Sequence, residues 1–351
     1  MRKLLLATCV ALSGITASAQ MSDVNAIKTY TVSALPKCPD AKVTLERVDK
    51  QGPTGFQVFG VTLTSSDKTC GKQTYLLYSP ASHTILMGNA FALPLDARPA
   101  EVRIAERTTE LLQHPLTATV SKTVLADGLR PVTITKETKF GPFAYHGFLD
   151  ASERYLIVGT RGNLQVSPSR TLLESIGIKN AVRRGNPKAK TQIIELSDFE
   201  CPTCGRAHKV IEPLVEKNLA KVDYYRLDLP LFEHHEWAVD AALGARAISK
   251  VAPAKYWAYE NFIFANQEAI ANQKFDDVLK NFCEDHDINW PAVQKIYRSP
   301  AERAALLEQV SRLFDNGVVS TPTYIVNGQI MGYGPEGTFT IKAIKDALGV
   351  K

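Results

Sequence analysis

The chain has 351 residues, of which 45% are hydrophobic and 22% charged, and its formal net charge is +5 at pH 7. A chain of this length predicts two globular domains rather than one. Because the small positive charge is scattered without a basic stripe, we do not expect nucleic acid as a partner. No segment beyond the first nineteen residues is long and apolar enough to span a membrane.

Residues 1–19 have the layout of a secretory signal peptide. Two basic residues open the segment, an apolar run covers residues 4–15, and residues 17–19 (Ala-Ser-Ala) form a cleavage signal. The apolar run is too short for a comfortable membrane anchor. We therefore expect an exported, periplasmic protein whose mature chain begins near Gln20.

Residues 20–180 are expected to form a separate α+β domain, a candidate for dimerisation or client binding. Short β-prone runs such as GFQVFGVTLT alternate with turn residues, and helical patterns cover residues 23–35, 101–112 and 169–176. The stretches around HTILMG and RYLIVG follow one outline of turn, strand, glycine, loop and helix. The similarity is too weak to predict a repeat. His83, His114 and His146 are isolated, so we find no catalytic constellation in this half.

The cysteines outside the signal peptide divide between the two halves. In an oxidising compartment most thiols pair. Cys38 and Cys70 are the only two in the mature N-terminal half, so a structural disulfide between them is the economical expectation. Cys283 lies where a helix would bury a small apolar residue, which predicts an inert core thiol.

Residues 181–190, in the basic run KNAVRRGNPKAK, are predicted to be a solvated linker to an α/β domain over residues 191–351. That domain should begin with strand, helix and strand at residues 191–197, 201–219 and 221–227. A helical insertion is expected at about residues 234–315. An Asn-Gly turn then predicts a strand hairpin over residues 323–332, and a last helix covers residues 338–348.

The pair Cys201 and Cys204 stands where the first of these strands meets its helix. At this junction the first sulfur lies over free backbone N–H groups at the positive end of the helix dipole, which stabilises a thiolate. The second sulfur, one turn inward, is shielded and suited to resolve a mixed disulfide. Pro202 suits the first helical position, and Thr203 completes the spacing.

Two other uses of this pair are weaker. A zinc site would add His208 as a third ligand, but no fourth ligand lies nearby in the sequence. A purely structural bridge would close a loop too small to constrain the unfolded chain much. We therefore predict a redox-active Cys201–Cys204 disulfide, with no metal and no cofactor.

The motifs ELSDFECPTCGRAH and GVVSTPTYIVNGQIMGYG together resemble the thioredoxin-fold thiol-disulfide oxidoreductases of the DsbA type, over roughly residues 188–351. The resemblance implies a thioredoxin-like fold with a helical insertion and a protein disulfide oxidoreductase or isomerase activity. By the same resemblance, Cys201 is the attacking cysteine and Cys204 the resolving one.

The resemblance also implies roles for residues outside the pair. Pro322 is similar to the family's cis-proline, which aligns substrate together with Thr321, Pro202 and Thr203. Thr321 resembles the DsbC and DsbG branch more than the main oxidase. Glu195 matches the family's buried carboxylate, which takes the proton from Cys204, although strand alternation gives mixed support for its burial.

Aromatic and histidine residues of the helical insertion are predicted to be structural. His234 and His235 are expected to belong to a solvated helix start rather than to the catalytic machinery. Helical spacing predicts a core position for the following four aromatic residues: Trp237, Trp257, Tyr259 and Phe262.

Three functions remain open from the sequence. The favoured one is an exported enzyme that forms or rearranges disulfides in other exported proteins, recharged by a quinone-linked membrane partner. The second is a thiol reductase that repairs sulfenic acids or wrong disulfides and draws electrons from a membrane donor. The third is a chaperone-like binding module in which the redox activity of the cysteine pair is secondary and the N-terminal half holds unfolded clients or builds a homodimer. Pro-Thr between the cysteines, in place of the oxidase histidine, predicts a less oxidising pair.

Overall fold

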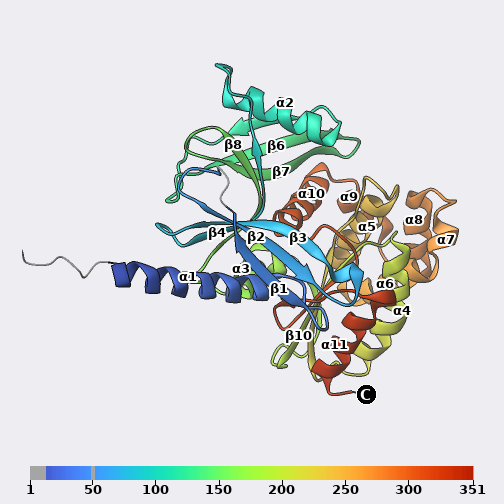
Figure 1. Cartoon of the computed structure of the whole chain (residues 1–351). Helices are drawn as coiled ribbons and strands as arrows, with labels where there is room; N and C mark the ends of the chain where they lie inside the picture. Colours follow the sequence, from blue (N-terminus) through green and yellow to red (C-terminus); the bar gives the residue numbers. More distant parts are fainter. Residues whose placement is uncertain (1–12, 49–51, 351) are drawn as a thin grey trace, which may run out of the picture.

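The structure is a computed structural model that describes residues 13–48 and 52–350. Its strands form an eight-stranded sheet in the N-terminal half and a five-stranded sheet in the C-terminal half (Figure 1). Residues 1–12 of the expected signal peptide lie outside the described part of the chain. In the part that is described, no helix has both the length and the apolar character needed to cross a membrane.

The N-terminal sheet is antiparallel throughout, in the order β1-β2-β3-β4-β8-β7-β6-β5. Its strands are β1 Lys42–Arg47, β2 Gln57–Thr64, β3 Lys72–Ser79, β4 Thr84–Ala92, β5 Thr117–Val120, β6 Arg130–Thr138, β7 Gly141–Leu149 and β8 Tyr155–Asn163. Alternate residues of β2, namely Phe59, Val61 and Leu63, are buried, and they pack against Ile27 and Tyr30 of helix α1, Ser13–Ala34. This alternation is the pattern of a sheet with one face on a core.

The sheet consists of two similar units joined edge to edge. Helix α1 precedes the meander β1–β4, and helix α2, Ala100–Leu112, precedes the meander β5–β8. Strands β4 and β8 pair antiparallel at the junction, with Gly88 opposite Gly159. A Cβ atom on Gly88 would lie 2.1 Å from the carbonyl oxygen of Val158, so only glycine fits here. The weak similarity between HTILMG and RYLIVG therefore marks equivalent strands of the two units.

The C-terminal sheet has the order β13-β12-β10-β11-β9. Strands β10, Thr191–Ser197, and β11, Val222–Asp228, are parallel and are connected by helix α4, Pro202–Glu216. Strands β12, Thr323–Val326, and β13, Gln329–Ile330, form the predicted hairpin, in which Asn327 and Gly328 have φ values of 51° and 80°. Two positive φ angles are what a type I′ turn requires. With helix α11, Thr338–Leu348, these elements confirm the predicted thioredoxin-like fold.

The predicted linker at residues 181–190 is partly wrong, because strand β9, Val182–Gly185, belongs to the sheet. It pairs antiparallel with β11, from Val182 opposite Arg226 to Gly185 opposite Asp223. Arg183 donates to Asp223 at 2.6 Å, and Arg184 pairs with Glu212 of α4. The basic residues that suggested a solvated segment are thus held by acidic partners.

The helical insertion lies between β11 and β12. Its helices are α5 Ala238–Val251, α6 Tyr256–Ala265, α7 Gln267–Ile270, α8 Phe275–Asp285, α9 Trp290–Tyr297 and α10 Pro300–Asp315. Side-chain caps mark the start of helices α9 and α10. Asn289 accepts from Ala292 N at 3.1 Å before α9, and Ser299 precedes Pro300, the first residue of α10. The four predicted aromatic residues all pack in or against the insertion core, as expected.

In the described part of the chain the two halves contact each other at several places, which include strand β7 and the residues around Lys37. Phe143 of β7 is fully buried among Leu307, Val310 and Leu313 of α10. Elsewhere Lys37 bridges in parallel to Met331, with Lys37 N donating to Ile330 O at 2.8 Å and Gly332 N donating to Lys37 O at 2.9 Å.

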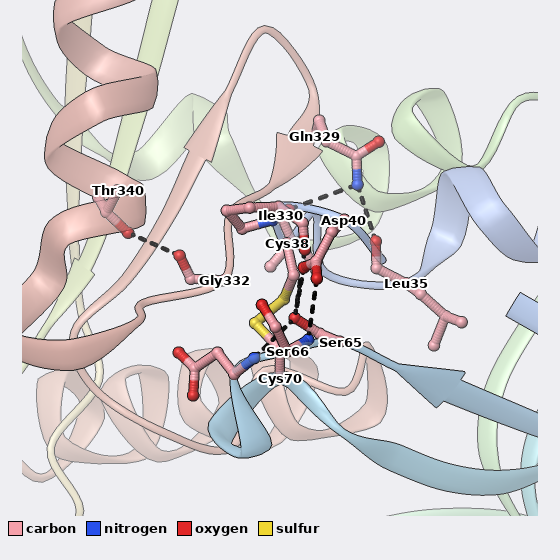
Figure 2. Close-up of a disulfide and its surroundings, with 12 residues drawn as sticks. Leu35, Cys38, Asp40, Ser65, Ser66, Cys70, Gln329, Ile330, Gly332 and Thr340 are labelled. Atoms are coloured by element: carbon pink, nitrogen blue, oxygen red, sulfur yellow. Dashed lines mark hydrogen bonds between the residues drawn. A yellow bond between two sulfur atoms is a disulfide. The ribbon is translucent and has the colours of Figure 1, made fainter. Parts of the chain in front are cut away.

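The Cys38–Cys70 disulfide fastens the residues around Lys37 to the N-terminal sheet, as Figure 2 shows. Beside it, Gln329 of β13 donates through its side chain to Leu35 O at 2.9 Å. The first cysteine follows α1 and the second precedes β3. The N-terminal half therefore extends the edge of the C-terminal sheet, next to the hairpin that follows Pro322.

Candidate active site

The local fold of the cysteine pair follows from its place at the start of α4. Cys201 is the N-cap residue and Pro202 the first residue of the helix. Gln267 of α7 fixes this backbone, because its side-chain amide donates to Phe199 O at 2.8 Å and to Cys201 O at 3.0 Å. Cys201 keeps 7% of its surface exposed, whereas Cys204 is completely buried, and both are free thiols.

The two thiols have opposite acidities. A hydrogen bond from Cys204 lowers the pKa of Cys201 to about 5, and the backbone N–H groups of Thr203 and Cys204 add to this effect. Burial raises the pKa of Cys204 well above its usual value, and Ser197 opposes that rise only in part. At neutral pH Cys201 is therefore a thiolate, whereas the buried Cys204 keeps its proton.

The loop before β12 brings its predicted residues to Cys201. The Thr321–Pro322 peptide bond is cis, and Cys201 Sγ lies 3.7 Å from Thr321 O. Thr203, which follows Pro202 in α4, accepts a hydrogen bond from Arg206 at 2.8 Å. Thr321 thus lies next to the Cys201 sulfur, and the substrate-binding role expected for Pro202, Thr203, Thr321 and Pro322 stays a prediction.

A cavity of about 520 Å³ adjoins this loop on the side of the N-terminal half. Its walls come from both halves and include Leu63, Met87, Val318, Pro322, Met331 and Tyr333. Tyr333 is also close enough to interact electrostatically with both active-site cysteines. The sequence pointed to no such cavity, because its walls come from segments far apart along the chain.

Glu195 lies under the site, where the resemblance placed it. It is 1% exposed, and Tyr224 of β11 donates its hydroxyl hydrogen to Glu195 Oε2. Its second oxygen, Oε1, has no hydrogen-bond partner among the described residues. Tyr324 interacts electrostatically with both Glu195 and Cys204, so the carboxyl group and the buried thiol face a common interior region. Transfer of the Cys204 proton to Glu195 remains a prediction.

A buried charged cluster beside Glu195 was not foreseen from the sequence. Arg226 of β11 donates to Glu260 of α6 at 2.6 Å and to Asp228 at 2.7 Å, and its guanidinium lies 4.1 Å from the ring centre of Phe199. Burial raises the pKa of Glu260 to about 8. The pattern YYRLD offered one signal, an arginine in the middle of an apolar strand.

His208 is not arranged as a ligand with the cysteines. Its Nε2 contacts Asn261 Oδ1 at 2.7 Å, and its ring packs 4.7 Å from that of Phe264. His208, Glu212 and Glu260 do present ligand atoms within 4.8 Å of one another. Arg184 and Arg226 already pair with the two carboxylates, so this arrangement is a charge-balanced cluster that disfavours a cation.

The two adjacent histidines at the start of the insertion differ, contrary to the expectation of one solvated pair. His235 Nδ1 contacts the buried carboxylate of Asp198 at 2.7 Å.

In the C-terminal half Cys283 is buried in α8 as predicted, and burial raises its pKa to about 11. The disulfide expected between Cys38 and Cys70 is present in the structure.

Part of the chain is similar to known proteins. Residues 178–348 match the family model described as Thioredoxin. The Na(+)/H(+) antiporter NhaA 3 of Salinispora tropica is 27% identical over 165 residues, which are 47% of this chain and 24% of that protein. The chain thus spans about a quarter of the length of the curated relatives it matches.

Solved structures that are similar to part of this chain include BdbD and alpha-DsbA1. BdbD from Bacillus subtilis is 18% identical with a TM-score of 0.43, and the match covers 49% of this chain and 95% of that one. The alpha-DsbA1 protein of Wolbachia pipientis is 17% identical with a TM-score of 0.44, over 51% of this chain and 96% of that one.

Proposed function

Residues 178–348 match the family model described as Thioredoxin, and from this premise we propose that the protein is an exported thiol-disulfide oxidoreductase. It forms or rearranges disulfide bonds in other exported proteins. The observation that carries the proposal is the pairing of Cys201, an acidic thiol that keeps 7% of its surface exposed, with the completely buried and weakly acidic thiol of Cys204, next to the loop of Thr321.

The reaction takes place in two exchanges. A client thiolate attacks Cys201 Sγ of the Cys201–Cys204 disulfide, so that a mixed disulfide forms and Cys204 departs and takes up a proton. A second client thiolate then attacks the client sulfur of the mixed disulfide and expels the Cys201 thiolate. The client gains a disulfide, and the enzyme pair holds the two electrons as a dithiol. Glu195 is the interior group that exchanges the Cys204 proton.

The acidity of Cys201 favours electron flow from client to enzyme. A thiolate of low pKa is a good leaving group, and its stability favours the reduced enzyme over the disulfide form. This argument outweighs the missing histidine between the cysteines. The cycle then requires a membrane partner that reoxidises Cys201 and Cys204. Pro322 lines the cavity between the two halves, which gives a client segment room beside the loop that carries Thr321.

The test is the redox equilibrium of the mature protein in glutathione buffers, with Cys201→Ala as the inactive control. We expect a reversible transition closer to ~−120 mV, as in DsbA, than to ~−270 mV, as in thioredoxin. A value at the thioredoxin end would favour the thiol reductase. If no reversible transition occurred in the unmodified protein, the enzyme proposal would fall and the binding module would replace it.

A further inference from the structure

The segment between β11 and α5 is fastened to the residues just before Cys201 by three hydrogen bonds. Leu231 N donates to Asp198 Oδ2 at 2.7 Å, and Trp237 N donates to Glu200 Oε2 at 2.6 Å. His235 makes the third bond, from Nδ1 to Asp198 Oδ2 at 2.7 Å. Together these bonds fix the imidazole beside the active-site loop, which Asp198 begins.

Asp198 is itself held in place and is inaccessible to solvent. Its side chain is 0% exposed, and its Oδ1 accepts from Glu200 N at 2.8 Å. Its own carbonyl oxygen accepts from Cys201 N at 3.2 Å. Because a buried carboxylate requires a compensating charge or several donors, a protonated His235 is the natural counterpart. One residue thus connects the imidazole to the backbone of the reactive cysteine.

The charged groups with the largest effects on the pKa of His235 come from the segment between β10 and α4. They are Asp198, Glu200 and Cys201. The hydrogen bond to Asp198 raises the pKa of His235 above its usual range, and the negative charges of Cys201 and Glu200 act in the same direction. His234, one residue earlier, has no such partner among the described contacts.

We propose that His235, positioned by Asp198, supplies the positive charge that stabilises the Cys201 thiolate in place of a histidine between the two cysteines. This inference rests on the proposed oxidoreductase function and adds to it a residue that tunes the redox pair. The dipeptide Pro202-Thr203 carries no charge. The structure therefore brings a cation to the sulfur from a segment more than thirty positions away in the chain.

The test compares His235→Gln with His234→Gln. Glutamine can still donate a hydrogen bond to Asp198 but carries no charge, so the fold is preserved while the cation is lost. We expect the ultraviolet thiolate transition of Cys201 in reduced His235→Gln to move upward by about one pH unit. Its glutathione equilibrium at neutral pH should move about tenfold toward the disulfide form. His234→Gln should match the unmodified protein in both measurements.

The pH profile separates an electrostatic role from a merely structural one. The imidazole is charged below its raised pKa and loses its charge as the pH rises through that value. The difference between the unmodified protein and His235→Gln should therefore be largest between pH about 5, where the thiolate forms, and the pKa of His235. The two proteins should converge at higher pH.

Failure of this inference differs from failure of the proposed function. If the unmodified protein cycles reversibly but His235→Gln and His234→Gln give the same thiolate transition, His235 has no electrostatic role. If the difference persists unchanged far above the pKa of His235, charge is not its cause. If the unmodified protein itself shows no reversible transition, the proposed function is wrong whatever His235 does.

Discussion

Cys201 and Cys204 share one helix start but occupy different environments. Cys201 keeps 7% of its surface exposed and is bordered by Thr321 and by the first N–H groups of α4, whereas Cys204 is completely buried. Through the hydrogen bond between them, Cys201 carries the negative charge and Cys204 keeps the proton. The chemistry of the site thus depends on the different burial and pKa that the fold gives to two identical side chains.

This inequality gives a prediction for the alkylation of the reduced protein. The rate at which Cys201 reacts with iodoacetamide should depend on pH with a midpoint at about 5, and the reaction should be lost as the pH falls through that value. Cys204→Ala removes the hydrogen bond that contributes most to the low pKa, so the midpoint should move upward. Cys283→Ala is the control, because that thiol is buried in α8 and should leave the midpoint unchanged. An unchanged midpoint in Cys204→Ala would contradict the assignment.

At the scale of single elements, strands β4 and β8 form the seam between the two units of the N-terminal sheet. Their backbones approach so closely at Gly88 and Gly159 that a Cβ atom on Gly159 would lie 2.3 Å from Met87 O. The obstacle is backbone rather than a flexible side chain, so it cannot turn aside. These two glycines are therefore required by the packing of one strand against the other.

Gly88→Ala should consequently lower the free energy of unfolding by about 1–3 kcal/mol, since the new methyl group forces the two strands apart. Gly60→Ala in β2 is the matched control, because its Cβ would lie 3.6 Å from Val48 Cγ2, an ordinary contact. Denaturant unfolding of both variants measures the difference. Equal stability of the two would show that the seam tolerates a side chain.

Whole-molecule organisation depends on the link between the two halves near Lys37. The Cys38–Cys70 disulfide holds this residue, which pairs with the strand edge at Met331. Gly332 packs against the disulfide so closely that a Cβ there would lie 2.5 Å from Cys38 Sγ. The disulfide therefore acts on both halves, although its cysteines both belong to the first.

Replacement of both cysteines, Cys38→Ser with Cys70→Ser, should lower the free energy of unfolding by about 3–4 kcal/mol. The reason is that the disulfide spans 32 residues and restricts the unfolded chain accordingly. Denaturant unfolding measures the loss, and the glutathione equilibrium of Cys201 and Cys204 should remain as in the unmodified protein. A variant of full stability would overturn this account of the disulfide.

The sequence predicted most of the C-terminal half because the information there is local. Helix periodicity and the Asn-Gly turn placed α4, α11 and the β12–β13 hairpin within a few residues of their observed bounds. Prediction from the sequence failed where a side chain has its hydrogen-bond or ion-pair partner on a distant segment of the chain. Strand β9 looked like a linker because its arginines find their acids on β11 and α4, and His235 looked solvated because Asp198 lies on another element.

The duplicated sheet has a consequence for how the molecule assembles. Where two separate chains join sheet edges, the joint forms only above a concentration set by its affinity. Here β4 and β8 belong to one chain, so their pairing is a first-order event that is independent of how many other copies are present. The long β surface beside the active site therefore remains intact at any dilution, even for a single molecule far from the next.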